Sequence, residues 1–485
     1  MVSAINFIGN LQLMVVHKNN VQPLSRDKQP IKNNEKISPL LRLAFPMALN
    51  GVIQVSMPVV KTVFLAQLSI DALAAGAIVG TLYALILYFL LGILSSISIF
   101  VAREYGAHHF KTIPLILRDG FLFGLVLIIF CFLIFQSIPQ FLSLIIKNIR
   151  LHDLVSSYLN ALVTGVPAHI FFFILIEFYL GIGQARFILK ISIVYAFFNI
   201  LASYCLIFGK FGMPFLGIAG AGWATSITNW LTLFFLVTYI SKKYFVFVLF
   251  GLLSKSKPKF LMEIIRIGIP LSGIYGIEAV TFFVTNVFMG KISIITLAAN
   301  QITLQFLSMT LAIIFSISRA ITVRIGHLIG SRRHELIQRV VLTGWFLNVG
   351  LAIAISLLFW YWPIVLISFD LTMNQQNKPL IDLASKFLLI SGVFLIIDAA
   401  RVTLIGILQS YKVTFYPMII SMFCFWMVAL PLGYILAFPL NNKGVGLWSS
   451  LIIGNLLAVV LLLPLTIMTL KTNSYEERVQ PGQSY

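Results

Sequence analysis

Twelve continuous apolar stretches run along this chain, and each is long enough to cross a lipid bilayer as an α-helix. They are rich in Leu, Ile and Phe and lack the short alternating pattern of membrane β-barrel strands. The composition agrees, because 59% of the residues are hydrophobic and only 10% are charged. The stretches cover residues 39–67, 72–100, 114–138, 156–181, 187–209, 216–240, 263–290, 294–323, 339–368, 383–408, 413–438 and 444–470. We therefore predict an all-α membrane protein with twelve transmembrane helices.

The second half of the chain repeats the first half. The matched segments are Leu41–Pro46 with Ile265–Pro270, Ser69–Ala75 with Ser293–Ala299, Gly106 with Gly330, Gly183-Gln184 with Leu408-Gln409, and Pro214–Trp223 with Pro439–Trp448. The first three pairs share one offset. Two homologous lobes are typical of secondary transporters, in which two bundles move against each other around a central site. The repeat thus indicates a transporter with six helices in each lobe.

We divide the chain into five parts. They are a cytoplasmic N-terminal tail (1–37), an N-lobe (38–241), a cytoplasmic linker (242–262), a C-lobe (263–470) and a cytoplasmic C-terminal tail (471–485). The first tail is polar, lacks the pattern of a cleaved signal peptide and is expected to be disordered.

Basic residues predict the orientation, because they resist translocation and remain in the cytoplasm. One set of connections carries Arg103, Lys111, Arg118, Arg186, Lys190, Lys242, Lys243, Lys255, Lys257, Lys259, Arg266, Arg324, Arg332, Arg333 and Arg339. The connections on the opposite side carry few basic residues. We expect both termini inside, in a bacterial inner membrane. Most of the formal charge of +19 belongs to this fringe, which favours lipid headgroups over nucleic acid as its partner.

Several classes of protein are not supported by the sequence. A nucleotide-driven pump needs a Gly-rich phosphate loop on a soluble domain, and no such motif is present. Cys131, Cys205 and Cys424 lie in apolar stretches without paired spacing, so they are interpreted as core residues and not as disulfides or metal ligands. We expect no enzyme activity, no catalytic residues, no metal and no cofactor, and we expect a monomer.

The ordered motifs resemble the multidrug and toxic compound extrusion (MATE) family, in its bacterial drug:cation antiporter branch. The resemblance spans about residues 39–470 and rests on LAFPMALNGVIQVSMPVV, DALAAGAI, GIGQAR, FNILASYCLIFGKFGMPFLGIAGAGWAT, IIRIGIPLSGIYGIEAVTFF, TLAANQI, DAARVTLIGILQSYK and LPLGYILAFPLNNKGVGLW. It implies two six-helix lobes in a V and a central cavity. It also implies export of cationic or amphipathic compounds driven by entry of H+ or Na+.

Charged residues inside apolar stretches are costly, so they usually face a cavity or a partner. Glu278 follows Tyr275 on a polar helical stripe, and the resemblance assigns Glu278 and Asp398 to a cation-coupling site in the C-lobe. A structural carboxylate is the alternative for Glu278. Arg401 is three residues after Asp398, close enough for contact, and departs from the uncharged family pattern. Their pair is either static or gated, and we favour the static pair.

A second polar stripe contains Gln301, Gln305, Ser308, Ala312, Ser316 and Arg319 at helical spacing. We predict that it lines the substrate cavity, together with Tyr275, Phe282 and Arg401; Phe282 could stack on drug rings. Arg319 could instead extend to the lipid headgroups. Glu177 is predicted to be either a cavity residue or an intrahelical partner.

Lys61 departs most from the resemblance, which implies an aspartate at that position in an N-lobe cation site completed by two asparagines. Asn199 keeps one of these amides, and Ser203 replaces the other. We predict that the Lys61 ammonium reaches toward Asn199 and Ser203 and acts as a built-in cation, because sodium binds poorly beside a fixed positive charge. The alternative is that Lys61 extends to the outer interface.

The sequence therefore predicts a secondary exporter of drugs or toxic amphipathic cations, coupled to protons in preference to sodium. A flippase for lipid-linked precursors is the alternative within transport, because Lys61, Arg319 and Arg401 suit phosphate headgroups. A regulatory membrane protein that has lost transport is the alternative outside it.

Overall fold

A computed structural model describes residues 38–145, 148–252, 257–369 and 374–479. From Leu40 onward the chain forms one compact unit. Every regular element in the described ranges is helical. The predicted disordered tail, residues 1–37, lies outside the described residues.

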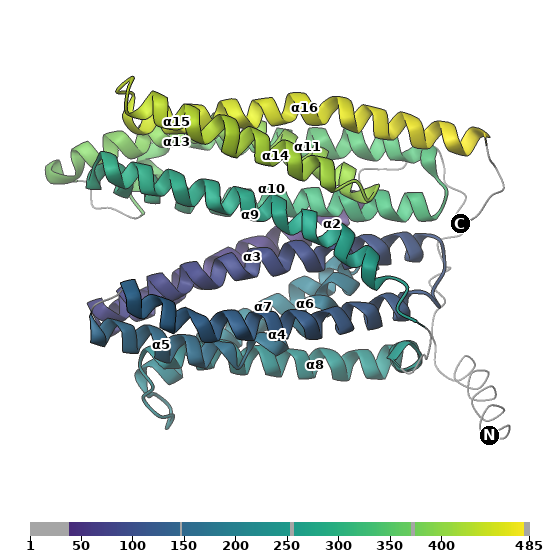
Figure 1. Cartoon of the computed structure of the whole chain (residues 1–485), viewed down its shortest axis with the longest axis horizontal. Coiled ribbons are helices and arrows are strands. Elements are labelled where there is room, and N and C mark those ends of the chain that lie inside the picture. Colours follow the sequence, from purple (N-terminus) through teal and green to yellow (C-terminus); the bar gives the residue numbers. More distant parts are fainter. Residues whose placement is uncertain (1–37, 146–147, 253–256, 370–373, 480–485) are drawn as a thin grey trace. The chain divides into compact units, whose positions relative to one another are not determined.

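The helices follow the two-lobe division (Figure 1). The N-lobe contains α2 (Ser38–Leu68), α3 (Ile70–Gly106), α4 (Ile113–Ile145), α5 (Ile149–Val163), α6 (Val166–Gly181), α7 (Ala185–Phe208) and α8 (Ile218–Leu252). The C-lobe contains α9 (Leu261–Ile292), α10 (Ile294–Gly330), α11 (Ile337–Tyr361), α12 (Pro363–Ile367), α13 (Lys378–Ser410), α14 (Phe415–Met422), α15 (Leu430–Ala437) and α16 (Lys443–Val479). Two short 3-10 turns, His334–Leu336 and Gln375–Asn377, precede α11 and α13.

The prediction of twelve spans is confirmed. Eleven described helices are long and apolar enough to cross a membrane, and α5 with α6 forms a twelfth span with a bend of 48°. The bend lies at Gly165, and Pro167 in the first turn of α6 cannot donate the hydrogen bond that would continue α5. This span begins at Ile149, earlier than the apolar stretch predicted from residue 156.

The internal repeat appears in the helix ends. The helices α3 and α10 are both 37 residues long. Each begins after a serine whose hydroxyl caps the first turn: Ser69 accepts from the Ala72 amide at 3.0 Å, and Ser293 accepts from the Thr296 amide at 3.0 Å. The symmetry is incomplete at the fifth span of each lobe. In the N-lobe this span is the continuous helix α7, whereas in the C-lobe it consists of α14 and α15 joined by a π-helical segment, Phe423–Ala429.

Two helices extend beyond the predicted boundaries. The helix α8 continues to Leu252, into the segment predicted as linker, and α16 continues to Val479, into the segment predicted as the C-terminal tail.

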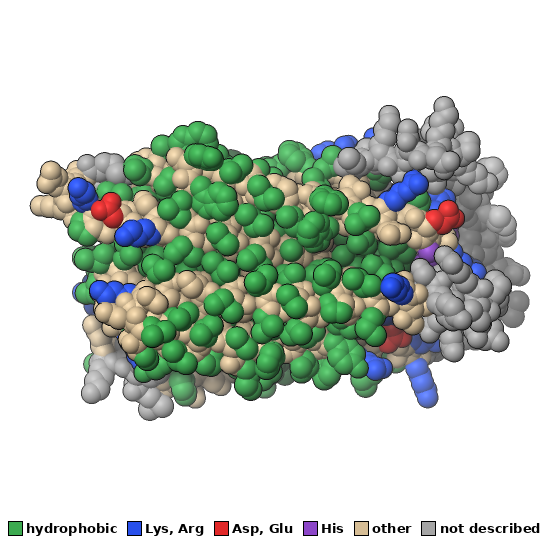
Figure 2. Space-filling view, turned by 90° about the horizontal axis from the view of Figure 1, so that it is seen from above, with side chains coloured by type: hydrophobic (Ala, Val, Ile, Leu, Met, Phe, Trp, Pro, Cys, Tyr) green, Lys and Arg blue, Asp and Glu red, His purple; other side chains and the backbone are tan. Residues whose placement is uncertain are grey.

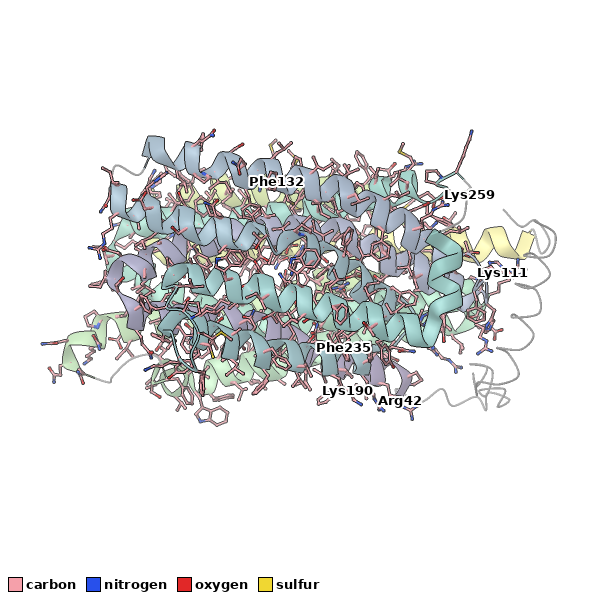
Figure 3. All side chains as sticks on the ribbon, turned by 90° about the horizontal axis from the view of Figure 1, so that it is seen from below. Arg42, Lys111, Phe132, Lys190, Phe235 and Lys259 are labelled. Carbon is pink, nitrogen blue, oxygen red and sulfur yellow. The ribbon has the colours of Figure 1, made fainter. Side chains whose placement is uncertain are left out.

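Charged and apolar side chains separate along the bundle. Hydrophobic side chains cover the middle of the face in Figure 2, and charged side chains gather toward its two ends. Arg42, Lys111, Lys190 and Lys259 lie toward the same end, whereas Phe132 and Phe235 lie along the sides (Figure 3). Both phenylalanines are more than half exposed, as expected for contact with lipid. We call the end with these four basic residues, where α2 begins, the basic end.

The lobes contact each other through α3 and α10 near the basic end. Arg103 on α3 donates to the backbone oxygen of Ser410 at 2.8 Å, and His327 on α10 donates to the backbone oxygen of Gly181 at 2.6 Å. The two donors, Arg103 and His327, occupy equivalent positions of the repeat, and we call the two contacts the interlobe clamps. Gly106 and Gly330 pack so closely that an added Cβ would lie 2.2 Å and 2.0 Å from the opposing backbone. Only glycine permits this approach.

Candidate functional site

Three charged side chains meet inside the C-lobe. Arg401 on α13 donates from Nη2 to Asp398 Oδ1 at 2.7 Å and from Nη1 to Glu278 Oε1 on α9 at 2.7 Å. The Arg401 and Asp398 side chains are each 2% exposed, and the Glu278 side chain is 13% exposed. Buried charges require such pairing, since removal of one partner leaves an uncompensated ion. We call these residues the C-lobe triad.

Neighbouring helices complete the surroundings of the triad. Asn455 on α16 donates to Asp398 Oδ1 at 3.1 Å. The guanidinium of Arg401 lies 5.2 Å from the ring centre of Phe425 in the π-helical segment, within the range of a cation–π contact. A small pocket beside the triad is lined by aromatic rings, including Phe282, Phe315 and Phe394. With both carboxylates ionised, the triad carries one net negative charge next to an apolar wall.

The structure contains the Asp398–Arg401 pair anticipated from helical spacing. It adds two contacts that the spacing did not predict, from Arg401 to Glu278 and from Asn455 to Asp398. Both connect different helices, so no local pattern encodes them. The only available signal was Asn455 itself, an isolated amide in an apolar span.

The other predicted cavity residues are separated. Phe282 and Arg401 line the triad pocket, but Tyr275, Gln301, Gln305 and Arg319 are not part of its lining. Tyr275 packs with its ring centre 6.1 Å from that of Phe315. Gln301 is exposed and lies near the N-terminal end of α10. The lining of the pocket therefore includes only two of the six residues predicted to line the substrate cavity.

Arg319 and Glu177 form an ion pair between the lobes. The Arg319 guanidinium on α10 donates to Glu177 Oε1 on α6, and the Glu177 side chain is 0% exposed. The prediction that Glu177 is a cavity residue or pairs within its own helix is thus corrected. Arg319 is directed to this carboxylate and not to the headgroups, because a buried charge is stabilised most by an opposite charge at close range.

Lys61 has a different partner from the predicted ones. Its ammonium on α2 donates to the Thr225 hydroxyl on α8. Asn199 and Ser203 on α7 are each 1% exposed, and Asn199 Nδ2 and Ser203 Oγ have no hydrogen-bond partner among the described residues. The ammonium points to a buried threonine, which does not fit the alternative of extension to the outer interface.

Two remaining sequence interpretations concern metals and cysteines. Cys131, Cys205 and Cys424 are buried, as predicted for core residues, and the structure has them as free thiols. Within the described ranges, no cluster of three or more His, Cys, Asp or Glu is arranged to hold a metal ion.

Twelve spans, two homologous lobes and paired charges inside the membrane define a multi-pass membrane transporter. The chain belongs to the MatE family, which matches residues 46–205 and 270–435, one segment in each lobe. It is not an enzyme. The resemblance stated from the sequence motifs is confirmed.

Relatives match along most of their length. The chain is 31% identical to the multidrug resistance protein NorM of Burkholderia vietnamiensis over 441 residues, which cover 89% of this chain and 94% of the relative. It is 30% identical to a probable multidrug resistance protein NorM of Mesorhizobium japonicum over 439 residues, which cover 89% and 93%.

Solved structures share the fold. The structure of a MATE protein in the bent conformation has a TM-score of 0.82 at 17% identity and covers 91% of this chain and 96% of that chain. The outward-facing conformation of a multidrug resistance MATE family transporter of the MOP superfamily has a TM-score of 0.81 at 16% identity and covers 91% and 99%. The predicted fold class is confirmed.

Proposed function

We propose that this protein exports amphipathic, cationic drugs across the bacterial inner membrane in exchange for protons. The relatives named as multidrug resistance proteins support the substrate class. The basic end, with its Lys and Arg connections, faces the cytoplasm by the positive-inside rule. The interlobe clamps at this end correspond to a conformation that is open toward the outside.

The charge of the C-lobe triad is the observation that carries the proposal. Two carboxylates and one guanidinium leave one net negative charge beside aromatic rings. One proton on Glu278 neutralises this charge, and so does one monovalent drug cation in the pocket. The site can therefore bind either the proton or the drug cation, but not both at once. Such exclusive binding couples proton entry to drug export in opposite directions.

The arrangement of donors favours protons over sodium. Arg401 donates to both carboxylates, and Asn455 donates again to Asp398. Sodium would need the same oxygen lone pairs, together with further oxygen ligands. In the N-lobe, Lys61 carries a positive charge where a sodium site would need a carboxylate. Glu278, the most exposed member of the triad, is the exchangeable group.

The alternative of a lipid-precursor flippase is less well supported. It relied on three cations, Lys61, Arg319 and Arg401, as a binding surface for phosphate. Arg319 is neutralised by Glu177, and Arg401 is neutralised by the triad carboxylates. Only Lys61 is left without an acidic partner in the described chain.

Reconstituted vesicles provide the test. We expect addition of a fluorescent cation such as ethidium to the substrate side to drive proton release through the wild-type protein, with no dependence on sodium. Glu335→Gln, which alters an exposed carboxylate near the basic end, serves as the control and should keep this flux. Sodium-dependent flux without proton movement would contradict the proposed coupling, and no flux at all would favour a regulatory protein.

Orientation is tested independently. Reporters fused after Lys242 or at the C-terminus are expected in the cytoplasm, and a reporter between Lys147 and Asp153 is expected outside. The opposite labelling would overturn the orientation.

A further inference from the structure

The N-lobe contains a cation without an acidic partner and two buried polar groups without hydrogen-bond partners among the described residues. The Lys61 ammonium has one bond, to Thr225, and makes no ion pair among the described residues. The Asn199 amide nitrogen and the Ser203 hydroxyl are buried and have no hydrogen-bond partner there. Buried polar groups are normally satisfied, so unpartnered groups require an explanation.

These residues lie at one level of the lobe. The helices α2 and α7 run in the same direction, and Asn50 on α2 bonds with Ser192 on α7, which is 142 positions later. The residue 142 positions after Lys61 is Ser203. One turn beyond Lys61, Phe64 packs against Tyr204 at 6.1 Å and Phe208 at 6.0 Å between ring centres, which confirms this register.

The third helix adds Thr225 at the same level. Tyr195 on α7 donates to Asn229 on α8 at 3.0 Å. Because α8 runs opposite to α7, one turn from each of these residues brings Thr225 beside Asn199. Lys61 is level with Ser203, and it donates to Thr225, which is level with Asn199. The ammonium therefore lies at the same level of the lobe as the two unpartnered groups.

An ammonium and an amide NH2 cannot satisfy each other, because both are donors. The Thr225 hydroxyl is already committed to the Ala221 carbonyl. The Ser203 hydroxyl can accept a hydrogen bond, but it is neutral and cannot compensate the charge of the ammonium. An acceptor with negative charge would compensate the ammonium and would also accept from the Asn199 amide and the Ser203 hydroxyl. We propose that Lys61, Asn199 and Ser203 form a binding site for a singly charged anion in the N-lobe.

Two sources could supply this anion: free chloride, or the carboxylate of a zwitterionic substrate. The second source rests on the proposed export function, whereas the first does not. The experiment therefore has two arms, one without transport.

In the first arm, the thermal stability of the purified protein is measured while chloride replaces gluconate at constant ionic strength. We expect the melting temperature to rise by several degrees for wild type and for Lys61→Arg, and not for Lys61→Met. Lys61→Met removes a buried charge in favour of an apolar chain of similar length, so it should fold. Lys291→Met, at an exposed lysine at the end of α9, should keep the chloride response.

In the second arm, efflux of a carboxylate-bearing rhodamine is compared with efflux of its methyl ester. If the carboxylate binds, Lys61→Met should lower the preference for the acid by about tenfold, as expected for the loss of one charge-assisted contact. Ester efflux should persist and so verify export itself. A Lys61-dependent response in either arm supports the site and identifies its source. Responses that are identical in wild type and Lys61→Met in both arms would overturn it.

Discussion

The two lobes share a helical framework but differ in the surroundings of one cation inside each lobe. In the C-lobe, Arg401 lies between Asp398 and Glu278, and all three members of the triad are paired. In the N-lobe, Lys61 has only the neutral hydroxyl of Thr225. Duplication thus conserved helix lengths and caps while the chemistry of the lobes diverged. The comparison supports the proposal that the C-lobe triad, and not Lys61, is the coupling site.

The largest effect is expected at Glu278. Glu278→Gln removes the exchangeable carboxylate, so it should abolish gradient-driven efflux while drug binding stays measurable. The matched control is Gln54→Ala, because Gln54 occupies the equivalent position in the N-lobe, eight residues after the repeated proline. Vesicle transport and equilibrium binding measure the two properties. Retained transport with unchanged pH dependence would place the coupling group elsewhere.

The next effect is on stability. Arg401→Met leaves Asp398 and Glu278 without their shared cation, so we expect a loss of about 3–5 kcal/mol, as for other broken buried ion pairs. Arg401→Lys keeps the charge and should lose less. Denaturation in detergent measures the stability of both variants. Added sodium should recover part of the lost stability in Arg401→Met but not in Arg401→Lys. Equal stability of the two variants would argue against the triad as a charge-balanced unit.

Two asparagines provide a sharper comparison between the lobes. Asn455 donates to Asp398, so Asn455→Ala should cost about 1.5–3 kcal/mol, the range for hydrogen bonds to charged groups. The Asn199 amide nitrogen has no described partner, so in chloride-free buffer Asn199→Ala should cost less. The unfolding free energies of both variants, measured in chloride-free buffer, test this expectation. A larger loss of stability for Asn199→Ala than for Asn455→Ala would contradict the proposed difference between the lobes.

The smallest effect is a gain at Lys61. Lys61→Asp places a carboxylate near Asn199, Ser203 and Thr225, whose oxygens suit sodium. We expect sodium to stimulate efflux several-fold in this variant, whereas Lys61→Ala should remain independent of sodium. Absence of a sodium response, together with free modification of wild-type Lys61 by a membrane-impermeant amine reagent, would show that Lys61 lies at the interface.

The span count, the repeat and the Asp398–Arg401 contact were predictable, because each depends on local composition or on spacing within one helix. The contacts between helices were not. Arg401 reaches Glu278 across 123 residues, and Arg319 reaches Glu177 across 142, so their pairing depends on how the lobes pack. The bend at Gly165 was encoded locally by Gly165 and Pro167, but the hydropathy of the stretch concealed it.

The interlobe clamps have one further consequence. Each ends on a main-chain oxygen, of Ser410 or Gly181. The two acceptors differ in how they respond to substitution. Ser410 already carries a side chain, whereas a Cβ added at Gly181 would lie 2.6 Å from Val101 and would displace the carbonyl that His327 uses. Exchange of Gly181 should therefore weaken one contact at the basic end while the contact between Arg103 and Ser410 stays in place.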